Sequence, residues 1–203
     1  MDSGEESRAS GRPRDPEVER GILLATQDLL VESGYAGTTI AGVAQRAQCG
    51  KSAIYRRWSS KVDLVVAAVR ALHITTETPD TGTLRGDLIA AAMHFARSDE
   101  RSGHVLASLL SEIGRDPELR DVAYRTIGEP PVAALVAVIE RWIERGTVPA
   151  DVPVALVAGI VPTAAFGSVM LRQRSLEAEA VAELVDFVLL PALRVPAARA
   201  VEE

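Results

Sequence analysis

The segment from Thr38 to Lys61 constrains the fold of this chain more than any other part. Its first half places apolar residues at the i, i+3, i+4, i+7 spacing of one helix face: Ile40, Val43, Ala44 and Ala47. Thr39 precedes them as a good N-cap, and Gly50 ends the run with a residue that adopts positive φ easily. A second short run would bury Ala53, Ile54 and Trp58. Since neither small apolar face is stable alone, the pattern predicts a helix-turn-helix packed on a third helix.

The opposite side of this segment is basic and hydroxyl-rich. The residues expected to face outward are Lys51, Ser52, Tyr55, Arg56 and Arg57. No acidic residue occurs from Ser33 to Val62, and the chain's only two lysines lie here, although the whole chain carries a net charge of −6. Duplex phosphates attract Lys and Arg and accept hydrogen bonds from hydroxyls. We therefore expect the second helix to enter a major groove. The alternative is a solvated helix pair that is basic by chance.

The same residues resemble the signature of the TetR family of transcriptional repressors. The matching stretches are Gly34-Tyr35, Thr38-Thr39-Ile40, Val43-Ala44, Arg46-Ala47, Lys51-Ser52, Ile54-Tyr55-Arg56-Arg57-Trp58 and Ser60-Lys61. The close resemblance covers about residues 15–70, and the turn departs from the family's usual Gly-Val-Ser with Gln48, Cys49 and Gly50. It implies an all-α protein: an N-terminal three-helix helix-turn-helix DNA-binding domain and a C-terminal helical ligand-binding and dimerisation domain.

The sequence divides accordingly. Residues 1–14 form a polar tail, whose arginines could reach DNA or do nothing specific. Residues 15–61 are the predicted DNA-binding domain, with the helix-turn-helix at about 39–58, followed by a linking helix at 62–73 and an effector-binding and dimerisation domain at 82–194. We expect Gly128-Glu129-Pro130-Pro131 to interrupt the helix that starts after Asp116, Pro162 to kink another, and Ser175 to start the last. Strand patterns are absent from the sequence.

Composition limits the other classes of function. The sequence pI of about 5.2 means that any DNA contact is local. A single cysteine excludes an internal disulfide and a multi-cysteine zinc site, and His73, His94 and His104 lack metal-ligand spacing, so we expect no metal and no cofactor. No catalytic motif stands out, so an enzyme is not expected. Without a signal peptide or an apolar run of about 18 residues, we expect a cytoplasmic protein with no membrane contact.

The last two helices are predicted to form a homodimer. The stretches 154–161 and 181–190 are apolar on nearly all sides, and a helix of that kind must be buried all round. The resemblance implies a four-helix bundle between two subunits, and two-fold symmetry would match a palindromic operator. The alternative is a central core helix of a monomer.

The candidate site residues fall into two sets. The predicted DNA contacts are Thr39, Lys51, Ser52, Ala53, Tyr55, Arg56 and Lys61. Thr39, Tyr55 and Lys61 are assigned to phosphates, and the others to base edges or the adjoining backbone. The resemblance also implies a cavity for a small effector, and the side chains that could line it are Met93, His94, Phe95, Trp142, Phe166 and Met170. The alternative for each of these six is an ordinary core position, and Cys49 could be a redox switch or a small packed residue.

We therefore expect a homodimeric repressor that a small lipophilic effector releases from a palindromic operator in double-stranded DNA. Two alternatives remain open. One is a regulator that activates transcription or needs no ligand, and the other is a small-molecule-binding protein or enzyme with a degenerate helix-turn-helix.

Overall fold

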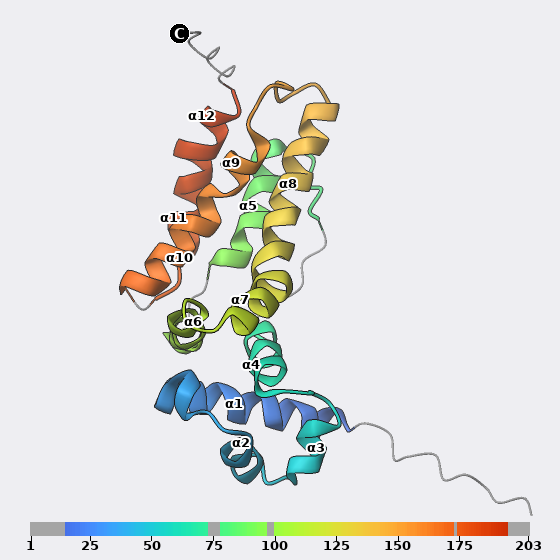
Figure 1. Cartoon of the computed structure of the whole chain (residues 1–203). Coiled ribbons are helices and arrows are strands. Elements are labelled where there is room, and N and C mark those ends of the chain that lie inside the picture. The colour runs from blue at the N-terminus through green and yellow to red at the C-terminus, as the bar shows by residue number, and fades with distance from the viewer. Residues whose placement is uncertain (1–14, 73–77, 97–99, 173, 195–203) are drawn as a thin grey trace, which may run out of the picture.

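A computed structural model describes residues 15–72, 78–96, 100–172 and 174–194. The described residues are helical apart from turns, loops and one isolated bridge between Ala96 and Leu176, which confirms the all-α prediction. The expectations for the tail at 1–14 and for His73 lie outside the described residues. Figure 1 shows helices α1 to α3 at one end of the molecule and α8 to α12 at the other, with α4, α6 and α7 between them.

The N-terminal end is a three-helix unit built from α1 (Pro16–Gly37), α2 (Ile40–Arg46) and α3 (Lys51–Tyr55). The Asp15 carboxylate accepts from the Glu17 amide at 3.0 Å and the Thr39 hydroxyl from the Gly42 amide at 3.0 Å, so both predicted caps are present. Gly34, with φ 68°, ends the regular part of α1. The buried core of this unit, on which Trp58 packs from the side, consists of Ile22, Ala25, Val43, Ala44, Ile54 and Leu64.

The turn between α2 and α3 differs from the expectation in one respect. Gln48, not Gly50, holds the positive φ, at 50°. Gly50 is extended, with φ −77° and ψ 147°, and caps α3 without a side-chain hydrogen bond. The prediction for Gly50 was therefore wrong, because the chain reverses two residues earlier, directly after Ala47 ends α2.

We expect Gln48→Gly to raise stability, because a non-glycine residue in the left-handed region costs about 1–2 kcal/mol. Glycine occupies that region freely, although it also gains entropy in the unfolded chain. The net result should be an increase in Tm of about 2–4 °C for a chain of this size, measured by differential scanning calorimetry. Gly50→Ser is the control: its Cβ would meet Ser52 Oγ at an ordinary 3.5 Å, and it should shift Tm less. A lower Tm for Gln48→Gly would contradict the prediction.

Helix α4 (Lys61–Arg70) links this unit to the rest of the chain. Gln27 of α1 donates from Nε2 to the Ala68 carbonyl at 2.8 Å, and Ser108 of α6 (Glu100–Ile113) donates to the Leu30 carbonyl at 2.7 Å. A buried cluster from α1, α4, α6 and α7 (Pro117–Ala123) fills the junction: Leu30, Val62, Val65, Val66, Val69, Val105, Leu109, Leu119 and Ala123. The two parts of the chain are thus joined by apolar packing as well as by α4.

The C-terminal part packs α5, α8 and the last helices around a third core. Its elements are α5 (Leu84–Ala92), η1 (Met93–Phe95), η2 (Tyr124–Gly128), α8 (Glu129–Glu144), α9 (Val154–Ala158), α10 (Ile160–Arg172), α11 (Ala178–Leu184), η3 (Val185–Leu189) and α12 (Leu190–Ala192). Fully buried Leu88, Leu135 and Val181 come from three of these helices and meet in this core. The last helix begins at Ala178 rather than Ser175, and the 154–172 helix is interrupted at Gly159, three residues before Pro162.

The predicted interruption at 128–131 does not occur. Helix α7 continues through the π-helical segment η2 into α8, and the Glu129 amide donates to the Tyr124 carbonyl five residues earlier. Pro130 and Pro131, which have no amide hydrogen to donate, follow directly in α8. The wider π turn therefore carries the chain past both prolines, a solution that helix propensity alone does not reveal.

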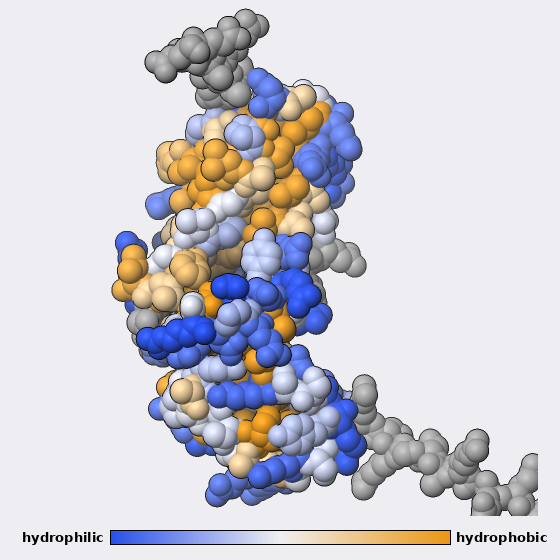
Figure 2. Space-filling model, viewed as in Figure 1, coloured by the Kyte–Doolittle hydropathy of each residue, from blue (hydrophilic) through white to orange (hydrophobic). Residues whose placement is uncertain are grey.

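Two helical stretches, Pro117–Glu144 and Val154–Arg172, are long and apolar enough to cross a membrane by length and composition. That test is also passed by core helices of soluble proteins, and both stretches contribute to the buried cores described above. Figure 2 shows hydrophobic residues gathered at the C-terminal end of the molecule, over α9, α11 and α12.

Candidate nucleic-acid interface and ligand cavity

Helix α3 presents its predicted contact residues on the surface. Lys51, Ser52, Tyr55 and Arg56 are exposed, Tyr55 with 56% of its surface open, while Ile54 is fully buried beneath them. Ala53 is half-buried. Within the described residues neither Lys51 nor Arg56 forms an ion pair. These two cations are therefore available to phosphates or base edges.

Two other arginines of the basic segment are engaged within the protein. Arg46 forms a two-pronged pair with Glu32 on α1, with both N–O distances 2.6 Å. Arg57 was expected to face outward, but its side chain is only 8% exposed. It donates to the Ala53 carbonyl at 3.1 Å and lies 3.5 Å from Glu19, because the end of α3 packs against the start of α1. Arg57 thus links the end of α3 to the start of α1 instead of facing solvent.

Thr39 and Lys61, both assigned to phosphates, also have partners inside the protein. The Thr39 hydroxyl accepts the Gly42 amide as the cap of α2 yet remains exposed, so its own proton can still be donated. Lys61 donates from Nζ to the Tyr35 carbonyl at 2.6 Å and lies 4.1 Å from the Tyr35 ring centre. Burial lowers the pKa of the Lys61 ammonium, against the opposing effect of Glu112 and Asp116. Lys61 keeps two further N–H donors, so its phosphate role stays a prediction.

An apolar cavity of about 350 Å³ lies between η1, α6, η2 and α10. Three of the six predicted pocket residues, His94, Phe95 and Phe166, line it. The remaining wall is formed by Leu106, Leu110, Tyr124, Ile127, Gly128, Val132, Pro162, Thr163, Ala165, Val169 and Ser175. No Asp, Glu, Lys or Arg occurs among these described lining residues. The volume and composition suit a small lipophilic ligand.

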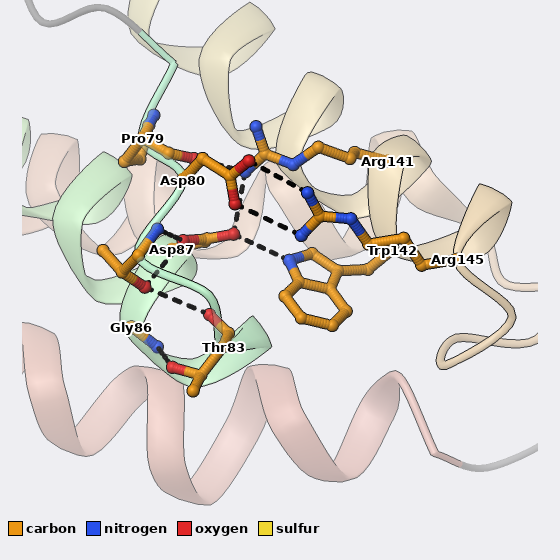
Figure 3. Close-up of polar contacts among 9 residues, drawn as sticks. Pro79, Asp80, Thr83, Gly86, Asp87, Arg141, Trp142 and Arg145 are labelled. Carbon is orange, nitrogen blue, oxygen red and sulfur yellow. Dashed lines mark hydrogen bonds and ion pairs between the residues drawn. The ribbon is translucent and has the colours of Figure 1, made fainter.

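The other three predicted pocket residues lie outside this wall. Met93 is 38% exposed beside it, and Met170 is half-buried on α10. Trp142 belongs to a separate polar cluster, drawn in Figure 3, in which its Nε1 donates to the Asp87 carboxylate at 2.8 Å. Arg141 donates to the same carboxylate oxygen at 2.8 Å and to the Pro79 carbonyl. Trp142 was proposed for its size, but its indole N–H turns it toward a buried carboxylate instead.

The cavity also uses residues that sequence reasoning missed. Tyr124, Ile127 and Gly128 come from η2, and no sequence pattern indicated a π turn there. Ser175 was interpreted as a helix start, but it lies in the connection before α11 with 8% of its surface exposed. The sequence does not show that Ser175 is buried in an apolar wall, so this residue could be recognised only from the structure.

Cys49 is partly buried against the core of the N-terminal unit. Among the described residues no group of three or more His, Cys, Asp or Glu could hold a metal ion. The packing contact agrees with the view of Cys49 as a small packed residue.

The outer face of α10, α11 and η3 carries a groove with strongly exposed apolar side chains beside it. Leu171 is 86% exposed and Phe187 is 78% exposed, and both line the groove. Leu156 on α9, outside the groove, is 71% exposed. Side chains of this size are seldom left so open on a monomer when they lie close together.

Comparison with known proteins gives consistent matches over most of the chain. The family model of bacterial regulatory proteins of the tetR family matches residues 22–68, and that of the tetracyclin repressor-like C-terminal domain matches residues 78–188. The chain is 31% identical to the DNA-binding transcriptional repressor TetR of Mycobacteroides abscessus, covering 88% of this chain and 94% of that protein. It is 29% identical to an HTH-type transcriptional regulator of Mycobacterium tuberculosis, over 94% and 96% of the two chains.

Solved structures share the fold. A putative TetR-family regulator from Rhodococcus sp. superposes with a TM-score of 0.70 at 16% identity, over 88% of this chain and all of that one. FadR of Bacillus subtilis, solved in complex with stearoyl-CoA, superposes with a TM-score of 0.57 at 15% identity, over 86% and 97%.

Proposed function

The chain belongs to the TetR family of transcriptional regulators, and we propose that it is a homodimeric cytoplasmic repressor released from a palindromic operator by a small lipophilic effector. The observation that carries the DNA-binding part is the exposed face of α3, where Lys51, Ser52, Tyr55 and Arg56 are open to solvent above a buried Ile54. In a chain of net charge −6, two cations on one short helix, with no carboxylate partner among the described residues, favour a local phosphate-rich partner.

The apolar groove on the outer face supports the dimer. Two copies that bury Leu171 and Phe187 against each other would remove the surface of these side chains from water. Repression by a protein of this kind requires both α3 helices to reach successive major grooves, roughly 34–36 Å apart on the duplex.

Effector control is supported by the position of the cavity. The segment η2 lines it and also meets the junction. Ala123, directly before η2, belongs to the buried cluster that contains Val66 and Val69 of α4, and Ile127 of η2 packs against that cluster. A ligand that favours one arrangement of η2 would shift the position of α4 and hence of α3, to the extent of its differential affinity for the two arrangements. FadR of Bacillus subtilis, which shares the fold, was solved with stearoyl-CoA, a ligand with a lipophilic chain.

The deciding experiment is a mobility shift at several salt concentrations on DNA upstream of the protein's own gene, repeated on a genome-derived fragment pool with random duplex as competitor. We expect a complex of two subunits per palindromic site. Equally weak binding to all sequences, with almost no salt dependence, would overturn the DNA-binding proposal. Transcription that rises when the protein is added would favour an activator.

Lys61→Ala should weaken binding to all DNA sequences alike. If each Lys61 neutralises one phosphate, the slope of log K against log salt falls by about 0.9 for every phosphate that the variant no longer neutralises. Fluorescence anisotropy with a labelled duplex at four or more salt concentrations measures this slope. Arg46→Ala is the matched control, because its guanidinium is already paired with Glu32. An unchanged slope in Lys61→Ala would remove Lys61 from the phosphate contacts and leave it as the partner of Tyr35.

A further inference from the structure

Ser175 places a buried hydroxyl in the wall of the apolar cavity. Its side chain lines the cavity with only 8% of the residue exposed, and its Oγ has no hydrogen-bond partner among the described residues. Buried hydroxyls are nearly always hydrogen-bonded, and leaving one unpaired costs free energy. A buried hydroxyl without a protein partner, in the wall of an apolar cavity, is placed to exchange a hydrogen bond with a ligand in that cavity.

The segment that carries Ser175 is held on both sides. On one side, the Ser168 hydroxyl of α10 donates to the Arg174 carbonyl at 2.9 Å. On the other side, Leu176 forms a backbone bridge with Ala96. The Ser175 hydroxyl is therefore presented from a fixed position, so it can select a ligand by where that ligand carries its polar group.

The charge of the cavity wall limits the ligand further. Because His94 is the only readily ionised side chain among the described lining residues, an ionised group would enter with little or no counter-charge, which is unfavourable in an apolar space. Phe95, Tyr124 and Phe166 offer aromatic surface for a flat or chain-like apolar body. The wall thus favours a neutral molecule over a carboxylate or an amine.

We infer that the effector is an uncharged lipophilic molecule bearing a hydroxyl or carbonyl group, and that Ser175 is the residue that recognises this group. The inference rests on the proposed function, since it assigns the chemistry of the effector cavity. Ser175 Oγ can donate to a carbonyl oxygen or exchange a hydrogen bond with a hydroxyl.

Three probes with one apolar body test the inference: 2-naphthol, naphthalene and 2-naphthoate, each titrated into the purified full-length protein by isothermal calorimetry. We expect 2-naphthol to bind more tightly than naphthalene by about fivefold, the value of one net hydrogen bond, and 2-naphthoate to bind most weakly. In Ser175→Ala the preference for 2-naphthol over naphthalene should disappear. Thr163→Val is the matched control, because Thr163 lines the same cavity but is exposed, and it should keep the preference.

A thermal melt separates ligand recognition from a structural role. Ser175→Ala without ligand should melt at the wild-type temperature or above it, because it removes an unpaired buried hydroxyl; a lower Tm would mean that the hydroxyl serves the fold. Equal affinity for naphthalene and 2-naphthol in the wild type, or tighter binding of 2-naphthoate, would overturn the inference while leaving an effector cavity. Failure of all three probes to bind would overturn it too. Operator binding without probe tests the regulator proposal independently.

Discussion

Replacing both Leu171 and Phe187 with glutamate is expected to convert the protein into a monomer. Both side chains are almost fully exposed beside the groove of α10, α11 and η3, so the substitutions disturb little of the subunit's own core. In the proposed dimer they would place four carboxylates in an apolar interface, where unpaired charges cannot be accommodated. Size-exclusion chromatography with light scattering gives the mass.

Loss of the dimer should also lower operator affinity by about 10²–10⁴-fold, because each half-site would be bound without the effective concentration that the second subunit provides. Val31→Glu, at a 42% exposed position on α1, is the control and should remain a dimer. A dimeric mass for the double variant would place the subunit contact elsewhere. A monomer that retains full operator affinity would instead contradict the proposal that two α3 helices of a dimer bind one operator.

Asp87→Ala is expected to destabilise the protein by about 3–5 kcal/mol, the cost of removing one partner from a buried ion pair. Asp87 is completely buried at the centre of the cluster in Figure 3, where its carboxylate accepts from the Thr81 hydroxyl at 2.7 Å and from Arg141 and Trp142 at 2.8 Å each. The substitution strands the Arg141 guanidinium and the indole N–H of Trp142. Urea unfolding at one fixed protein concentration measures the loss.

The matched control for this cluster is Asp80→Ala. Asp80 pairs with Arg145 at 2.9 Å, but both side chains are substantially exposed, so its removal should cost no more than about 1 kcal/mol. Similar losses for the two variants would mean that Asp87 contributes no more than a surface ion pair.

The free energy of unfolding should also depend on pH through the ionisation of Asp87. Burial acts to raise the pKa of the Asp87 carboxyl, but hydrogen bonds from Thr81, Trp142 and Arg141 outweigh it and hold the pKa below its ordinary value. A depressed folded-state pKa contributes stability above the unfolded value of about 3.9, and that stability is lost as pH falls through the folded pKa. Below about pH 4 the advantage of the wild type over Asp87→Ala should therefore begin to shrink, and urea unfolding should show a smaller difference between the two proteins at pH 3 than at pH 7.

The DNA-binding unit could be predicted in detail from sequence because its signals are local. The apolar spacing of α2, the Thr39 cap and the outward set on α3 depend only on neighbours within one or two helical turns. The same reasoning failed for Gln48 and Arg57. The place where a tight turn reverses depends on how α2 and α3 pack. The burial of Arg57 depends on its contact with Glu19 of α1, more than thirty residues earlier in the chain.

The helices of the C-terminal part could be predicted from the sequence, but most of the residues that line its cavity could not. Apolar helices with the composition of α8 and α10 pack in many ways, so the sequence does not tell which face of each meets the cavity. Trp142 donates a hydrogen bond to Asp87, which lies 55 residues earlier in the chain. His94 and Phe95 of η1 and Phe166 of α10 instead line the cavity together. The π turn at Tyr124–Gly128 follows from the tertiary fit of α7 and α8 around two prolines, and no local propensity encodes it.

By itself, then, the sequence determined the all-α class, the family and the basic reading helix, because periodicity, capping and charge are properties of short segments. Only the tertiary structure decided which cations stay available for DNA, where the cavity lies and that Ser175 faces it with no hydrogen-bond partner in the described part of the chain. Those features arise from contacts between residues that are distant in the chain, and such contacts produce no periodic pattern in the sequence.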